Sequence, residues 1–224
     1  MCLRVLVGTV SRVDVSTRAN EPVGEPKRSL RDGLGFFGNF LRNPGSVGAL
    51  LPSSRYLARA LVGWLDMKPG ELVVEYGPGT GPVTAVIRDA LPPGARYLGI
   101  ELEQRFHGLL TQRYPTLDFH HGSAADVLTI LAERGLPLPS RIVSALPFAS
   151  LTPAVQDAVV DGIVHCLRGT GSDFRTFQYV HAFGLRAARR FRAIMAERFE
   201  GFERIGPVVR NVPPAFVLRY WGAR

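Results

Sequence analysis

Residues 75–84 read EYGPGTGPVT, and they separate the apolar run LVV (72–74) from the helix-like pattern PVTAVIRDAL (82–91). Glycine permits tight turns and lets a ligand approach the backbone closely. In an α/β protein, a glycine-rich turn between the first strand and the first helix lies at the carboxyl end of the parallel strands, where ligands bind. The stretch therefore predicts a ligand crevice, or more simply a turn that tightens strand–helix packing.

The spacing of the glycines narrows the choice of ligand. Gly77, Gly79 and Gly81 alternate, and Pro82 occupies the next position, so the third glycine comes one residue too early for a dinucleotide fingerprint. No Lys-Ser or Lys-Thr pair follows, which excludes a phosphate loop. What remains is E-x-G-x-G-x-G, with Glu101 closing the next strand twenty residues beyond Gly81. A carboxylate at that place can accept hydrogen bonds from both hydroxyls of a ribose.

From residue 71 onward, short β-like runs alternate with helix-like segments. Strands are expected at 72–76, 96–101, 117–121, 141–146 and 173–181, with helices at 82–91, 103–114, 124–135, 152–167 and 185–199 between or after them. This alternation predicts an α/β fold with a mostly parallel sheet and helices on both faces. Two further strands, 202–209 and 215–222, have no helix between them and predict an antiparallel hairpin at one edge. Helical patterns at 29–43 and 53–65 precede the sheet.

Composition indicates one substantial domain. The chain has 224 residues, 46% of them hydrophobic, and a net charge of +8 that favours polyanionic partners, either nucleic acid or anionic lipid. Cys2 and Cys166 have no metal-ligand or CxxC spacing, so neither a metal site nor a disulfide scaffold is expected, and a reducing cytoplasm fits. No apolar run reaches the roughly 18 residues of a spanning helix.

The pair EYGPGTG and GIE (99–101) resembles the Rossmann-like S-adenosylmethionine-dependent methyltransferases, over about residues 45–224. The resemblance implies a seven-stranded sheet ending in an antiparallel hairpin, with S-adenosylmethionine as cofactor. In that family the acid at Glu75 sits near the methionyl ammonium, the 77–81 loop lies against the cofactor, and Glu101 holds the ribose. The implied cofactor-binding residues are Glu75, Gly77, Gly79, Thr80, Gly81, Glu101, Leu102, Ser123, Ala124 and Ser144.

The end of the third strand departs from the family pattern. An acid that contacts the adenine amine is usual there, but HGSAAD offers Ser123, with Asp126 three residues on. We expect Ser123 and the Ala124 amide to make this contact rather than Asp126. A plain N-cap role for Ser123 is the alternative.

The fourth strand ends SALPF (144–148), which resembles the N-x-P-Y loop of amino-methylating enzymes. In those loops the first side chain, here Ser144, and the following carbonyls orient the target nitrogen for in-line attack on a sulfonium methyl. Phe148 replaces the usual Tyr. The simpler interpretation is a strand end followed by a proline turn.

The whole set of motifs is similar to bacterial phospholipid N-methyltransferases, which convert phosphatidylethanolamine stepwise towards phosphatidylcholine. The set adds FLRNPGSVGALLPSS (40–54) and RNVPPAFV (210–217) to the two motifs above. Ornithine-lipid N-methyltransferases and rRNA adenine dimethyltransferases share much of the pattern, so another amine acceptor stays open. A non-catalytic S-adenosylmethionine-binding protein is a third hypothesis.

A lipid-modifying enzyme must reach the bilayer, and residues 27–42 combine basic and bulky apolar side chains suited to an anionic membrane surface. The alternative is a helix that covers the cofactor pocket with its apolar face. The expected organisation is a flexible tail (1–27), N-terminal amphipathic helices (28–68) and a catalytic domain (69–224). The Arg-rich segment 185–199 lacks the aromatic interleaving of RNA-binding modules. We therefore expect a phospholipid substrate, no nucleic acid, and a cytoplasmic protein peripheral to the inner membrane face.

An ethanolamine nitrogen is protonated at neutral pH and must lose a proton before it attacks. Tyr179 and His181 alternate at the end of the fifth strand and should point to one face. The candidate catalytic residues are Ser144, Tyr179 and His181, with His181 as proton acceptor or phosphate contact, or with purely structural roles. Arg55 and Tyr56 could meet a lipid headgroup, or lie on a helix surface. No metal site is expected.

Overall fold

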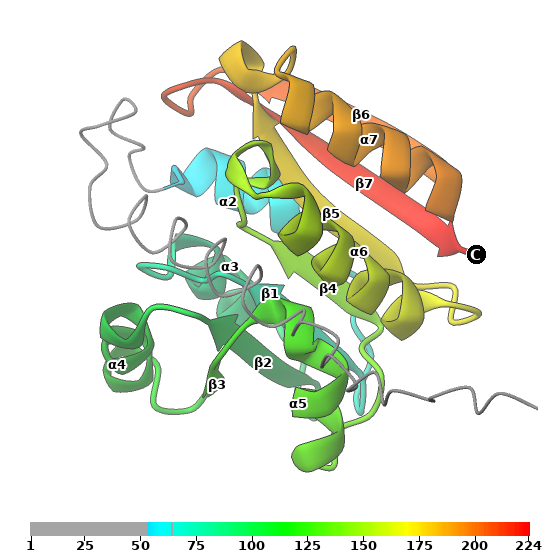
Figure 1. Ribbon diagram of the computed structural model, residues 1–224. Helices are drawn as coiled ribbons and strands as arrows, with labels where there is room; N and C mark the ends of the chain where they lie inside the picture. Colours follow the sequence, from blue (N-terminus) through cyan, green and yellow to red (C-terminus); the bar gives the residue numbers. More distant parts are fainter. Residues whose placement is uncertain (1–52, 64) are drawn as a thin grey trace, which may run out of the picture.

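The computed structural model describes residues 53–63 and 65–224 (Figure 1). The tail expected at 1–27, the helix expected at 29–43 and the membrane segment expected at 27–42 lie outside the described residues. The helices are α2 (Arg55–Val62), α3 (Pro82–Ala90), α4 (Gln104–Arg113), α5 (Val127–Glu133), α6 (Pro153–Leu167) and α7 (Arg186–Arg198). The strands are β1 (Leu72–Tyr76), β2 (Arg96–Glu101), β3 (Asp118–His121), β4 (Arg141–Ser144), β5 (Asp173–Tyr179), β6 (Phe199–Val208) and β7 (Ala215–Ala223). Short 3-10 turns are η2 (Ala124–Asp126), η3 (Phe148–Ser150) and η4 (Val180–Ala182).

The strands form one seven-stranded sheet in the order β3-β2-β1-β4-β5-β7-β6. The first five strands are parallel, whereas β7 runs antiparallel to both β5 and β6. At its edge of the sheet, β6 is hydrogen-bonded to β7 alone. The expected α/β fold, its seven strands and its C-terminal antiparallel hairpin are thereby confirmed.

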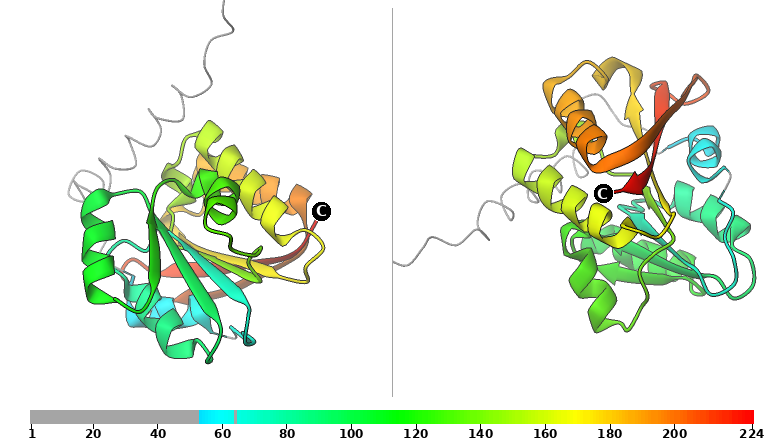
Figure 2. Two further views of the ribbon diagram at one scale, coloured as in Figure 1. Left: turned by 90° about the horizontal axis from the view of Figure 1, so that it is seen from below. Right: turned by 90° about the vertical axis from the view of Figure 1, so that its right-hand side faces the viewer.

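Helices cover both faces of the sheet, as Figure 2 shows. Alternate residues of a strand point to opposite faces. On β1, Leu72, Val74 and Tyr76 therefore belong to the core under α5, α6 and α7. Val73 points the other way, into the core shared with α2, α3 and α4. The β1–α3 loop follows Tyr76, so it lies at the carboxyl end of the parallel strands, beyond the two cores.

The fifth strand ends earlier than expected. The sequence pattern predicts a strand over 173–181, but β5 stops at Tyr179 and the chain turns into η4. The Val180 amide donates to the Pro214 carbonyl at 2.8 Å, on the connection that leads into β7. This long-range bond continues the antiparallel β5–β7 pairing one residue past the Tyr179–Ala215 pair, and the chain then turns into η4. Similarly, the helix expected at 124–135 divides into η2 and α5.

Candidate active site

The glycine-rich loop between β1 and α3 is a tight turn built on left-handed backbone. Gly77, Gly79 and Gly81 have φ angles of +65°, +59° and +84°, which side chains other than glycine rarely adopt. The Tyr114 hydroxyl donates to the Gly81 carbonyl at 3.0 Å, and the Arg113 guanidinium donates to the Thr80 carbonyl at 3.2 Å. The end of α4 therefore holds this loop in place.

Glu101, at the tip of β2, is tied to this loop. Its Oε2 accepts a hydrogen bond from the Gly79 amide and its Oε1 from the Glu103 amide, both at 2.9 Å. Burial raises the pKa of this carboxyl, and the amide hydrogen bonds oppose that rise. Each carboxylate oxygen has a further lone pair for a ligand hydroxyl. A Cβ added at Gly79 would meet no atom of residues 53–63 and 65–224 within 4 Å, so the backbone there faces open space in this part of the chain.

Glu75 lies beneath the loop, at the end of β1, with no exposed surface. Its Oε2 accepts hydrogen bonds from the Thr84 hydroxyl at 2.8 Å and from the Tyr97 hydroxyl at 2.7 Å. Its Oε1 has no hydrogen-bond partner among the described residues. Burial raises the pKa of Glu75 from 4.5 to about 7. A buried acceptor without a partner is costly, and a cationic donor at Oε1 would remove that cost.

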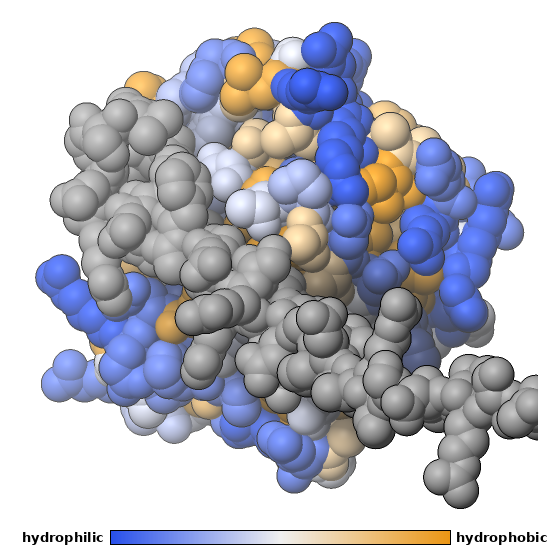
Figure 3. All heavy atoms as spheres, in the orientation of Figure 1, coloured by the Kyte–Doolittle hydropathy of each residue, from blue (hydrophilic) through white to orange (hydrophobic). Residues whose placement is uncertain are grey.

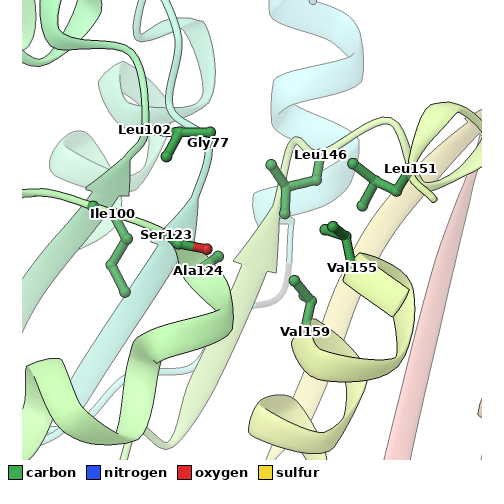
Figure 4. A pocket seen from close by; sticks show the side chains of 10 residues that line it. Gly77, Ile100, Leu102, Ser123, Ala124, Leu146, Leu151, Val155 and Val159 are labelled. Atoms are coloured by element: carbon green, nitrogen blue, oxygen red, sulfur yellow. The ribbon is translucent and has the colours of Figure 1, made fainter. Parts of the chain in front are cut away.

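An apolar slot opens beside the loop, between the carboxyl ends of β2 and β4 (Figure 4). Its walls are Gly77, Ile100, Leu102, Gly122, Ser123 and Ala124 on one side and Leu146, Leu151, Val155 and Val159 on the other. A Cβ at Gly77 would lie 2.7 Å from Leu146 Cδ2, so only glycine fits there without displacing the opposite wall. The slot as it stands has a volume of about 20 Å³, so a flat ring would enter it only if the opposite walls moved apart.

Ser123 lines the slot and also caps η2. Its Oγ accepts a hydrogen bond from the Ala125 amide at 3.1 Å, so the capping role weighed from the sequence is present. Asp126 is exposed and is not among the residues that line the slot. The adenine contact expected from Ser123 and Ala124 stays a prediction.

The SALPF turn after β4 is held by hydrogen bonds within the protein. Ser144 is fully buried, and its Oγ accepts from the Leu146 amide at 3.2 Å. The Gln156 amide group donates to the Phe148 carbonyl at 2.5 Å and accepts from Arg190 at 3.0 Å. Ser144 does not line the slot or the β5 pocket described next. Its hydroxyl therefore shapes the turn.

A second pocket, which we call the β5 pocket, opens at the end of β5. It is lined by Pro147, Phe148, Ala149, Ser150, Phe177, Gln178, Tyr179, His181, Ala182 and Leu185. The rings of Tyr179 and His181 stack with centroids 5.6 Å apart and planes inclined by 17°. The structure thus brings these two predicted residues together at one pocket wall, even though His181 is in η4 rather than in the strand. Burial raises the pKa of Tyr179 to about 12, so its phenol stays protonated near neutral pH.

Several residues that shape these pockets were not identified from the sequence. Tyr97 and Thr84 bind the Glu75 carboxylate, Tyr114 anchors the glycine loop, and Gln156 supports the SALPF turn. Thr84 and Gln156 do carry a signal, because each is a polar residue among the apolar, inward-facing positions of its helix. Their partners are distant in sequence and have no comparable signal.

The sequence was compared with protein families, curated proteins and solved structures, and no protein-family model matches it. The ornithine lipid N-methyltransferase of Singulisphaera acidiphila is 30% identical over 189 residues, covering 83% of this chain and 94% of that enzyme. The ribosomal RNA small subunit methyltransferase A of Prosthecochloris aestuarii is 26% identical over 108 residues, or 48% of this chain and 39% of that enzyme. The O-methyltransferase of Bacillus cereus, solved in complex with SAH, superposes with a TM-score of 0.58 at 14% identity, covering 89% of this chain and 93% of that one.

The sheet order and the glycine-rich crevice define a Rossmann-like methyltransferase fold. With 30% identity over nearly the whole length of the Singulisphaera enzyme, the chain belongs to the S-adenosylmethionine-dependent methyltransferases, in the family that includes that enzyme, and its cofactor is S-adenosylmethionine. Within residues 53–63 and 65–224, no helix is long and apolar enough to cross a membrane. In the same part of the chain, no cluster of three His, Cys, Asp or Glu side chains could hold a metal ion.

Proposed function

We propose that the protein transfers a methyl group from S-adenosylmethionine to the amine nitrogen of a membrane-lipid headgroup. The observation that carries this proposal is the match to an ornithine lipid N-methyltransferase across 94% of that enzyme's length. The rRNA methyltransferase match covers only 39% of its enzyme. A lipid amine is therefore the acceptor class that we favour over an rRNA adenine.

Three features of the crevice support this location for the cofactor. Glu101 would accept hydrogen bonds from the ribose hydroxyls through its remaining lone pairs, while the Gly79 and Glu103 amides hold it in position. The open space at Gly79 would receive the nucleoside against the backbone. The unpartnered Oε1 of Glu75 would balance the charge of the methionyl ammonium, directly or through water. Both carboxyls have raised pKa values that a bound cation would lower.

The apolar slot would hold the adenine ring. Leu102 and Leu146 line opposite walls, and their side chains can sandwich a flat ring. Ser123 and the Ala124 amide lie at one side of the slot, where the adenine edge needs hydrogen-bonding groups. Thr80 and Gly81 would contribute through the backbone shape of the loop.

The β5 pocket would receive the lipid amine. The cofactor supplies an electrophilic sulfonium methyl, so the enzyme's own task is to position a neutral amine in line with it. A primary ammonium has to lose a proton first, and His181 is the basic side chain at this pocket wall that we assign to that step. Tyr179 stays neutral and would orient His181 by stacking. Ser144 would act indirectly, by shaping the turn that borders the pocket.

Two lipids are candidates for the headgroup. Ornithine lipid is the first, because the Singulisphaera enzyme is named for it. Phosphatidylethanolamine, methylated stepwise towards phosphatidylcholine, is the second, because the sequence motifs resemble that group of enzymes. Either substrate requires the protein to work at the membrane surface. We therefore retain residues 27–42 as a proposed anionic-lipid contact and a peripheral position at the inner membrane face.

The test is a methyl-transfer assay on full-length protein. Methyl-labelled S-adenosylmethionine is incubated with vesicles that contain ornithine lipid, vesicles that contain phosphatidylethanolamine, and 16S rRNA in a separate reaction. We expect labelled lipid in at least one vesicle reaction and none in rRNA. Label in rRNA with none in either lipid would replace the lipid proposal with the nucleic-acid alternative.

A further inference from the structure

Four large aliphatic side chains are exposed at the carboxyl end of the sheet. Val180 and Leu185, which follow β5, are 41% and 51% exposed, and Val209 and Val212, between β6 and β7, are 70% and 65% exposed. We call these four residues the apolar rim. In Figure 3, hydrophobic residues gather at the upper edge, over the connection between β5 and α7. Aliphatic side chains so far from a core often mark a surface that meets a partner.

The two halves of the rim are joined by the fold. The Val180 amide bonds to the Pro214 carbonyl at 2.8 Å, and Tyr179 pairs with Ala215 at the start of β7. The hairpin tip is also fixed to the start of α2, because the Asn211 side chain accepts a hydrogen bond from the Ser54 amide at 2.8 Å. The rim therefore comes from two separate parts of the chain, and the start of α2 lies beside it.

Positive charge surrounds this surface. The guanidinium groups of Arg55 and Arg210 both lie 5.1 Å from the centre of the Tyr56 ring, and Arg59 is exposed one turn along α2. The three segments that build the surface, residues 53–65, 180–196 and 204–224, contain no Asp or Glu. A partner that meets this face must be anionic at its surface and must accept aliphatic side chains.

The rim also borders the entrance of the β5 pocket. Leu185 is half exposed and lines that pocket, and His181 of the same pocket is exposed beside Val180. A molecule bound across the rim would therefore lie over the pocket where we place the amine. An RNA partner would gain little from the rim, because bases stack on aromatic rings rather than on valine and leucine.

We propose that the apolar rim docks on an anionic lipid bilayer, with its aliphatic side chains in the interface and the arginines against the headgroups. Docking in this orientation would present a lipid headgroup to the β5 pocket without removing the lipid from the membrane. The proposal rests on the proposed function for the identity of the substrate. The surface itself is separate from residues 27–42.

The test measures binding of the full-length protein to vesicles of phosphatidylethanolamine and phosphatidylglycerol by co-sedimentation. The double variant Val209→Asp, Val212→Asp should bind at least about tenfold more weakly, because it places two charges in the interface. The matched control is Leu138→Asp. Leu138 is 49% exposed and lies between α5 and β4, at the opposite end of the parallel strands. The control should bind as the wild type does.

Binding of the double variant within twofold of wild type would overturn the proposal, as would an equal loss in the control. If the double variant instead changes the oligomeric state in sedimentation equilibrium while vesicle binding persists, the rim contacts a second copy of the chain. If it loses binding to a short RNA but keeps vesicle binding, the partner is nucleic acid. Leu185→Asp provides a second variant, and circular dichroism of each variant verifies its fold.

Turnover separates this proposal from the proposed function. On substrate lipid dispersed in detergent micelles, the double variant should retain turnover within about threefold of wild type, because docking on a bilayer is not needed there. On vesicles it should lose turnover in proportion to binding. If wild-type protein binds vesicles through the rim but methylates no aminolipid in either form, the proposed function fails and the docking surface stands.

Discussion

Replacing Glu101 with Gln changes one atom of the residue proposed to hold the ribose. The wild-type carboxylate accepts two backbone amide hydrogen bonds, from Gly79 and Glu103, both at 2.9 Å, and it is 1% exposed. A glutamine offers one oxygen and one NH2 group. In either orientation, one backbone amide then faces a second donor. The residue also loses the charge that strengthens hydrogen bonds from the ribose hydroxyls.

The expected magnitude follows from these contacts. A hydrogen bond to a charged acceptor contributes about 1.5–3 kcal/mol, and an unsatisfied buried amide costs about 1–3 kcal/mol. The unsatisfied backbone amide is present with and without cofactor, so it lowers the stability of the fold more than the affinity for the cofactor. This loss of stability is partly offset, because burial raises the pKa of Glu101 and the charge of Glu101 is therefore unfavourable in the cofactor-free protein. Loss of one to two charged hydrogen bonds weakens cofactor binding by about 3 kcal/mol, which raises the Kd roughly 150-fold.

Isothermal titration of S-adenosylmethionine into wild type and Glu101→Gln measures this change, and thermal denaturation without cofactor reports the cost to the fold. Glu133→Gln is the control, because Glu133 is an exposed carboxylate at the end of α5. We expect the control to bind as wild type does. A Kd for Glu101→Gln within threefold of wild type would show that this carboxylate does not hold the ribose, and the location proposed for the cofactor would then be wrong.

Four further changes test other parts of the site. Gly79→Ala and Gly70→Ala both place a Cβ on backbone with positive φ, with no atom of the described residues within 4 Å. The two variants should therefore lose similar free energy of unfolding, about 1 kcal/mol each. Only Gly79→Ala should weaken cofactor binding in titration, by about tenfold or more. The pKa of Glu75 is raised from 4.5 to about 7, so the folded state binds this proton more tightly than the unfolded state. Its contribution to stability is therefore present at low pH and is lost as pH rises. Between pH 5 and pH 8, the free energy of unfolding measured in urea should fall by about 2–3 kcal/mol more for wild type than for Glu75→Gln. Gln156→Leu removes the donor to the SALPF turn and should lower the free energy of unfolding by about 1–3 kcal/mol in the same assay. His181→Ala should reduce kcat on lipid by about 100-fold or more, with the cofactor Kd unchanged.

Each of these expectations has a contrary outcome. Equal cofactor affinities for the Gly79 and Gly70 variants would place the nucleoside away from the loop. A pH dependence of unfolding that survives in Glu75→Gln would assign the titration to another group. An unchanged free energy of unfolding in Gln156→Leu would mean that the Gln156 hydrogen bond does not stabilise the SALPF turn. Unchanged turnover in His181→Ala would remove that imidazole from proton transfer.

The sequence predicted the fold well because its signals were local. The glycine-rich turn, the Thr152 cap with Pro153 at the start of α6, and the apolar β-like runs all lie within a few residues of the elements that they define. The hairpin was predictable for the same reason, since two strand patterns follow each other without a helix between them. The strand order, which was not predicted, follows from the usual connections of such folds.

The site was predicted less completely because its supporting bonds are long-range. The connection after β5 is bonded through the Val180 amide to Pro214, and the SALPF turn depends on Gln156 and Arg190 in two different helices. Ser144 was predicted from a resemblance to orient the target nitrogen, and the bond that its Oγ accepts from the Leu146 amide was not predicted. The position of a residue along a predicted strand indicates which part of the sheet it lies in. The hydrogen bonds of its side chain depend on residues distant in the chain, which the local sequence pattern does not include.

The order of the last two strands makes the fold sensitive to its final residues. The edge strand of ten residues is anchored in the sheet only through its nine-residue neighbour, which comes after it in the chain. Translation must therefore proceed past residue 223 before either strand can take its place. A premature stop at codon 215 would remove nine strand residues directly and leave the preceding ten without a neighbour. Such a truncation would remove the hairpin and also Val217, Leu218 and Tyr220, which are buried in the two cores.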